Sequence, residues 1–399
     1  MVIKKTQIIY SSKMTIQEHL SQMKEMYSSI LSYISESNSL MNFSSLIKIL
    51  EKNQIGDNLH LLKTLLHILL NISNDYHRSP TFIGKIEKII KYFKDKINKC
   101  FPNWEIFNIF KSNKRILLFL FEEKIIKMDN DIAAQIINYK YTKRNYHKYF
   151  LPEIKPFIDE KFLKNHGCGC SISDFSTNLP ENFYEKRKSG ENDSFLCEMI
   201  RNDSVTEFSS FVRKKKISLD EKIDESIYET NLFLLKNKYA HLIEYNISLI
   251  EYAAFFGSVK IFNYLRKNGA KLTPSLWIYA IHSHNAEIIH TLDENKVKPE
   301  DESYRECFYE SIRCHNKDIA NYFISIFLNE KDKNAPETAK RCLKYYNFDF
   351  AKSEFINELF FIELCQYDHY LFVDSLLNKR DFDVNKIIIY NTFVSYNLK

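Results

Sequence analysis

Residues 248–270 read SLIEYAAFFGSVKIFNYLRKNGA, and this stretch decides the fold that the sequence predicts. Apolar residues recur at helical spacing on either side of Gly257, which indicates two short antiparallel helices joined by a tight turn. The small side chain of Ala253 lets the first helix lie close to its neighbours, and Gly257 tolerates the positive φ of the turn. The predicted framework positions of this helix pair are Leu249, Ala253, Ala254, Gly257, Ile261, Leu265 and Gly269.

The same pattern recurs along the chain. A shift of 27 residues finds it at 275–292, and two further shifts of 31 residues find it at 311–320 and 342–351. The corresponding framework positions are Ala280, Ile288, Leu292 and Ile319. Weaker copies lie at 200–208, at 371–385 and, faintly, at 108–124. Because no single pair can bury its apolar face alone, we expect the copies to stack side by side.

Composition agrees with a helical protein. The chain of 399 residues contains only 7 Gly and 8 Pro, too few for the frequent turns of an all-β domain. Hydrophobic residues make up 45%, which permits a large core, and a formal charge of +5 does not by itself require nucleic acid or a membrane. We therefore expect an all-α fold, an α-solenoid of stacked antiparallel helix pairs.

The repeated residues resemble the ankyrin consensus, in which Thr-Pro-Leu-His-x-Ala-Ala is followed by Gly-His, a Val/Leu helix and Gly-Ala-Asp-Val-Asn. Residues 248–254, Gly257, 261–265 and 269–270 carry the match, and 381–385 (DFDVN) matches the hairpin segment. The chain also looks like a large family of protist ankyrin-like proteins with a domain of unknown function, on the passages 110–121, 188–193 and 249–258. This resemblance implies an ankyrin-like solenoid that binds other proteins, and it implies no catalytic residue.

Two departures from the ankyrin pattern affect the expected geometry. The spacing of 27 residues is shorter than the ankyrin length of about 33 residues, so we expect shortened hairpins. The glycine between the two helices is replaced in other copies by Asp203, His284, His315 and Tyr346. For domains, we expect a helical part at 1–150 that contains divergent repeats, an irregular connection at 151–192, and an ankyrin-like repeat domain at 193–399.

One loop carries residue types that bind metals. His166, Cys168 and Cys170 could supply three ligands, but the spacing differs from common zinc modules and no second cysteine pair accompanies it. We favour an ordinary irregular loop and expect no metal or cofactor. His282, His284, His290 and His315 lie in or beside the repeats, and we expect structural roles for them because their spacing does not place them on one helix face.

Two basic segments raise nucleic acid as an alternative partner. Residues 139–149 (YKYTKRNYHKY) interleave aromatic and cationic side chains, and 213–216 (RKKK) lie at the end of a predicted helix. Helix amphipathicity and compensation of the helix dipole explain both segments more simply. No phosphate-binding glycine loop or nucleophile motif occurs, so we expect no enzyme.

The sequence thus predicts a scaffold or adaptor for protein–protein interactions, with nucleic-acid association or metal binding through 166–170 as the alternatives. Partners of ankyrin arrays are usually held by the loops between units and by first helices, which makes Lys271, Lys298 and Asp301 the candidate contact residues. The start of the chain lacks an apolar signal region, and the apolar run 59–72 is too short to span a bilayer. We expect an intracellular, cytoplasmic protein, with the nucleus as an alternative.

Overall fold

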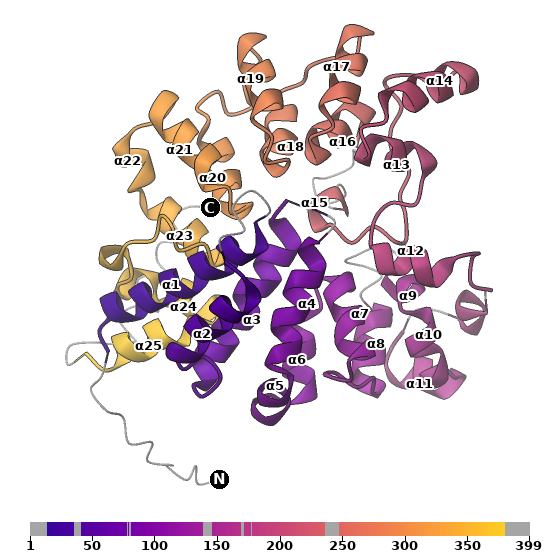
Figure 1. The fold of residues 1–399 in the computed structure, drawn as a ribbon. Helices are drawn as coiled ribbons and strands as arrows, with labels where there is room; N and C mark the ends of the chain where they lie inside the picture. The colour runs from indigo at the N-terminus through magenta and orange to yellow at the C-terminus, as the bar shows by residue number, and fades with distance from the viewer. Residues whose placement is uncertain are drawn as a thin grey trace. The chain divides into compact units, whose positions relative to one another are not determined.

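The structure is a computed structural model that describes residues 14–35, 41–77, 79, 81–138, 146–168, 171–176, 178–235 and 247–379. All regular secondary structure in these residues is helical, which confirms the all-α prediction (Figure 1). Their β-structure is limited to an isolated antiparallel bridge between Lys222 and Ser248. The segment 381–385, which matched the ankyrin hairpin, lies outside the described residues.

The chain forms two compact units, and the boundary between them falls within helix α3 (Leu59–Asp75). One unit comprises residues 66–329, and the other combines 1–65 with 330–399. These units follow from contacts, whereas the expected segments 1–150, 151–192 and 193–399 follow from the repeat pattern. The three-part division therefore stays a prediction about where repeats occur.

The unit made from both ends of the chain has a shared core. Helix α1 (Ile16–Ile34) packs against α2 (Phe43–Lys52) and also against α25 (Tyr370–Leu377) from the far end of the sequence. The rings of Tyr27 and Phe348 meet edge to face at 6.1 Å. The remaining elements of this unit are α22 (Glu330–Lys333), α23 (Pro336–Tyr345), η4 (Ser353–Phe355), η5 (Glu358–Phe360) and α24 (Phe361–Gln366).

The other unit contains the helices that the sequence pattern predicts most clearly. Four consecutive pairs are α13 (Phe195–Arg201) with α14 (Val205–Lys215), α16 (Leu249–Phe256) with α17 (Val259–Lys267), α18 (Leu276–His282) with α19 (Ala286–Glu294), and α20 (Arg305–Arg313) with α21 (Lys317–Ile326). The first helices contact one another in the order α13, α16, α18, α20. Each pair therefore contacts the next one through its first helix.

The rest of this unit precedes the four pairs or connects to them. Its elements are α4 (Phe82–Tyr92), α5 (Lys94–Cys100), α6 (Asn103–Phe110), α7 (Lys114–Glu122), α8 (Asn130–Asn138), α9 (Tyr146–Tyr149), α10 (Leu151–Ile154), η2 (Lys155–Phe157), α11 (Glu160–Asn165), η3 (Ile172–Phe175), α12 (Phe183–Ser189) and α15 (Leu232–Leu235). Helices α6 and α7 pack together, so the faint copy at 108–124 is also a helix pair.

The turns between paired helices share one backbone conformation. Gly257 has φ of 70°, and each residue that replaces it in the sequence pattern also has positive φ: Asp203, His284, His315 and Tyr346. Left-handed backbone is uncommon outside glycine, so its recurrence at aligned positions supports the alignment. Asp368, between α24 and α25, has the same conformation and was not recognised from the sequence.

Three of the turns that follow second helices also have positive φ at aligned positions. Gly269, Lys296 and Lys124 occupy aligned positions, and their φ angles are 101°, 55° and 57°. In each case the following residue donates its N–H to a carbonyl five positions back, as in Ala270 to Leu265. This is the Schellman geometry that closes a helix end, and α7 shares it with α17 and α19, whereas Phe327 at the end of α21 has φ of −116°.

The predicted framework is mostly buried. Eight of its positions are at most 1% exposed: Leu249, Ala253, Ala254, Ile261, Leu265, Ala280, Ile288 and Leu292. Ile319 is only half-buried. The copy at 342–351 lacks a second helix: residues 347–352 are irregular and Phe348 enters the core, although Asn347 makes the same side-chain bond to the backbone as its equivalent Asn285, the N-cap of α19.

Candidate functional site

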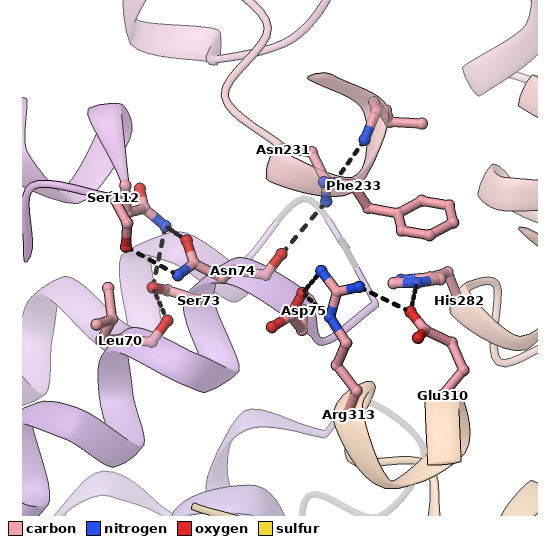
Figure 2. A network of polar contacts seen from close by, with 12 residues as sticks. Leu70, Ser73, Asn74, Asp75, Ser112, Asn231, Phe233, His282, Glu310 and Arg313 are labelled. Carbon is pink, nitrogen blue, oxygen red and sulfur yellow. Dashed lines mark hydrogen bonds and ion pairs between the residues drawn. The ribbon is translucent and has the colours of Figure 1, made fainter. Parts of the chain in front are cut away.

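A buried polar network joins the end of α3 to the last helix pair of the unit 66–329 (Figure 2). Asp75 accepts hydrogen bonds from Nε and Nη2 of Arg313 at 2.9 and 2.7 Å, and each side chain is only 7% exposed. The two residues are 238 positions apart in the sequence. Both donors converge on Oδ1 of Asp75, and charge-assisted hydrogen bonds of this kind tie the end of α3 to α20.

The network continues from Arg313 across two neighbouring first helices. Nη1 of Arg313 donates to Oε1 of Glu310 at 3.1 Å, and the same oxygen lies 2.7 Å from Nε2 of His282 (Figure 2). Phe255, His282 and Arg313 are equivalent positions of successive copies, so the repeat places them on one face. Stacking brings this face together: the rings of Phe255 and His282 are 5.1 Å apart.

Neutral side chains complete the network around the end of α3. Asn113, the N-cap of α7, donates to Oγ of Ser73 and Oδ1 of Asn74, both at 3.0 Å. The amide of Asn74 donates to Ser112 at 3.3 Å, and Asn231 donates to the backbone oxygen of Asn74 at 3.4 Å (Figure 2). These contacts pair buried polar groups that would otherwise be costly to remove from water.

Cys314 adds a thiol to the charged part of the network. The side chains of His282, Glu310 and Cys314 each offer one ligand atom, and these atoms all lie within 4.8 Å of one another. In the part of the chain that the structure describes, this is the one such group of three histidine, cysteine or acidic side chains. Sequence reasoning missed it because α18 and α20 must pack before the three residues meet.

The inter-helix histidines His284 and His315 lie at the turns between paired helices, and their expected structural roles stay a prediction. Nε2 of His284 lies 3.3 Å from the backbone oxygen of Cys314, and Asn316 caps α21 by accepting the N–H of Ile319 at 3.2 Å. Burial lowers the pKa of both His284 and His315 to about 3. His290 lies instead on the exposed face of α19 beside Glu294.

A cavity of about 490 Å³ opens beside the loops that precede α18 and α20. Its apolar lining includes Phe233, Ile278 and Tyr279, and the ring of Phe233 lies tilted at 4.2 Å from the ring of His282. Among the described residues, every charged side chain that lines the cavity is acidic: Glu300, Asp301 and Glu306. The cavity therefore combines an apolar wall with a negatively charged rim.

The structure places the three candidate contact residues differently. Asp301 lines the cavity, where its Oδ2 accepts the N–H groups of Arg305 and Glu306 at 3.0 and 3.3 Å. Its Oδ1 is buried without a hydrogen-bond partner in the structure. Lys271 and Lys298 are exposed and lie outside the cavity lining; Lys298 pairs with Glu302 at 3.5 Å.

The other candidate segments are only partly described. His166 contacts the backbone oxygen of Phe162 through Nδ1 at 3.0 Å, and Cys168 is buried, whereas Cys170 lies outside the described residues. In the segment 139–149 the described rings of Tyr146 and Tyr149 are buried, which leaves neither of them able to stack on a base. Residues 213–216 end α14, and Lys216 is its C-cap.

No family model matches the chain, and neither a curated protein nor a solved structure matches it. None of the described helices combines the length and apolar character needed to cross a membrane.

Proposed function

We propose that the chain is an ankyrin-like α-solenoid with shortened hairpins that works as a protein-interaction scaffold and not as a catalyst. Support comes from the recurring helix pairs, whose first helices contact one another in sequence order. The positive-φ turn between paired helices recurs at Asp203, Gly257, His284, His315 and Tyr346, which keeps these copies in register. Such a stack presents its inter-unit loops along one edge, where a partner can reach them.

The cavity beside α18 and α20 is the proposed binding site. The single observation that carries this choice is the lining of the cavity, which combines an apolar wall with the acidic residues Glu300, Asp301 and Glu306. An apolar wall favours an apolar side chain, and a negatively charged rim favours a cationic one. The partner is therefore proposed to be a protein segment that inserts an apolar side chain next to a Lys or Arg.

Site-specific photo-crosslinking in cells tests this proposal. A photoreactive amino acid replaces Glu300, an exposed residue of the cavity rim, in the full-length chain. Replacement of Glu287, exposed on the second helix α19, is the matched control. We expect a discrete crosslinked protein with the photoreactive residue at position 300 and none at position 287. Asp301→Asn should reduce the yield of the crosslinked product from position 300. Identical products at both positions, or none at position 300, would contradict the proposal.

A further inference from the structure

The geometry points to a second, independent site: His282, Glu310 and Cys314 bind a zinc-like divalent ion. Their three ligand atoms lie within 4.8 Å of one another, and Nε2 of His282 is already 2.7 Å from Oε1 of Glu310. A tetrahedral zinc ion with bonds of about 2.0–2.3 Å needs its ligand atoms about 3–4 Å apart. Small side-chain adjustments therefore suffice to place an ion between them.

The ligands are held by the fold before any ion binds. The ring of His282 is 2% exposed and packs against Phe233 at 4.2 Å and Phe255 at 5.1 Å. Glu310 lies in α20 and Cys314 is the C-cap of the same helix, so their spacing of four residues brings them to one face. Cys314 is fully buried. Ordering the ligands therefore costs little entropy when the ion enters.

Charge balance supports an ion at this position. Asp75 and Glu310 carry two negative charges against one positive charge on Arg313, which leaves one buried negative charge when His282 is neutral. A divalent ion together with the Cys314 thiolate adds one positive charge and brings the cluster to neutrality. Binding converts the thiol to a thiolate and releases one proton to solvent. The competing explanation is a protonated His282, which neutralises the cluster without any ion.

The surroundings resemble the outer shell of a metal site. Arg313 donates to Glu310 and is itself held by Asp75, so the ligand carboxylate is oriented by a second layer of hydrogen bonds. Such outer partners typically change metal affinity by about 10–100-fold. Imidazole and thiolate select zinc-like ions over magnesium or calcium, and three protein ligands leave a fourth position for water or a further ligand.

Metal analysis of the full-length chain tests this inference. Protein purified without added metal or chelator is assayed for bound zinc, and the metal-free protein is then titrated with Co²⁺. We expect about one ion per chain and a thiolate-to-cobalt charge-transfer band in the near ultraviolet. Cys314→Ser should abolish the band and weaken binding by more than about ten-fold. Cys307→Ser is the matched control, since Cys307 is equally buried in α20 but outside the cluster.

Two further variants keep the test decisive. Glu310→Gln should weaken Co²⁺ binding and retain the charge-transfer band, because the thiolate is still present. Cys168→Ser should leave both unchanged. If the folded wild-type protein binds neither zinc nor Co²⁺, the inference is overturned. The cluster is then a hydrogen-bonded network of His282, Glu310, Arg313 and Asp75 without a metal. Loss of the band in Cys168→Ser, or equal behaviour of Cys314→Ser and Cys307→Ser, overturns it as well.

Discussion

Ala253 shows how closely one side chain sets the spacing of the helix pairs. It is fully buried in α16, the helix that packs against α18. Ala253→Leu forces extra volume into this contact, so we expect a loss of about 1–3 kcal/mol in the free energy of unfolding. Chemical denaturation measures the change, with the exposed Lys260→Ala as a control expected to stay within about 0.5 kcal/mol. An unchanged stability in Ala253→Leu would place Ala253 outside the contact.

Two histidines make the unit built from both chain ends sensitive to acid. Burial lowers the pKa of His19 and of His60, and the ring of His60 stacks 3.7 Å from that of Tyr370. The unfolded chain therefore binds protons more tightly than the folded one, so stability is complete above the unfolded pKa of about 6.5 and falls as the pH decreases below it.

The pH dependence can be assigned by substitution. Each histidine contributes a slope of at most about 1.4 kcal/mol per pH unit below pH 6.5. The double variant His19→Gln, His60→Gln should unfold with a flatter pH dependence than wild type, measured by denaturation between pH 7 and about pH 5. Equal slopes would mean that other groups control acid unfolding.

At the scale of helices and turns, two glycines make a matched comparison. Gly257 has φ of 70°, and an added Cβ would meet the Cβ atoms of Ser283 and Asn285 at 3.3 Å. Gly84 lies within α4 with nothing inside 4 Å of an added Cβ. We expect Gly257→Ala to destabilise the chain by about 1 kcal/mol or more, and Gly84→Ala to stabilise it by about 0.5–1 kcal/mol. Thermal unfolding of both variants measures the difference, and the same sign in both would refute the turn assignment.

The helix pairs were predictable because their signals are local. Apolar spacing around Ala253 and the turn glycine Gly257 indicated two helices, and alignment then located the turns at His284 and His315. Asp368 escaped detection because its copy keeps few framework residues. The missing second helix after Tyr346 also could not be predicted, since Asn347 stands at the position where Asn285 and Asn316 cap second helices.

At the scale of the whole chain, the polar network was beyond sequence reasoning. No sequence motif links Asp75 to Arg313. The repeat pattern predicts which neighbouring helix pairs are in contact, but it does not predict a contact between residues that are 238 positions apart. The same holds for His282, Glu310 and Cys314, each of which is ordinary in its own helix. Among the predicted contact residues, Asp301 does line the cavity, because loops between pairs are where a stack exposes its backbone.

The Asp75–Arg313 ion pair gives a prediction about the stability of the unit 66–329, in which it connects α3 to α20. Arg313→Met leaves the buried carboxylate of Asp75 uncompensated, so we expect a loss of about 3–5 kcal/mol. In the double variant, Asp75→Asn removes the uncompensated charge and should recover part of the lost free energy of unfolding. A double-mutant cycle measured by denaturation on metal-free protein gives the coupling energy. Additive single effects would show that the ion pair does not connect the two helices energetically.

The two ends of the chain share one core, and neighbouring residues of α25 can test this. Leu376 is fully buried, whereas Leu377 is 49% exposed, and α25 packs against α1. Leu376→Ala should cost about 2–5 kcal/mol and speed hydrogen exchange of amides in α1, although α1 lies at the opposite end of the sequence. Leu377→Ala is the control and should leave α1 protected. Hydrogen exchange read by mass spectrometry distinguishes the variants: unchanged protection of α1 in Leu376→Ala would mean that the N-terminal helices fold without the C-terminal ones.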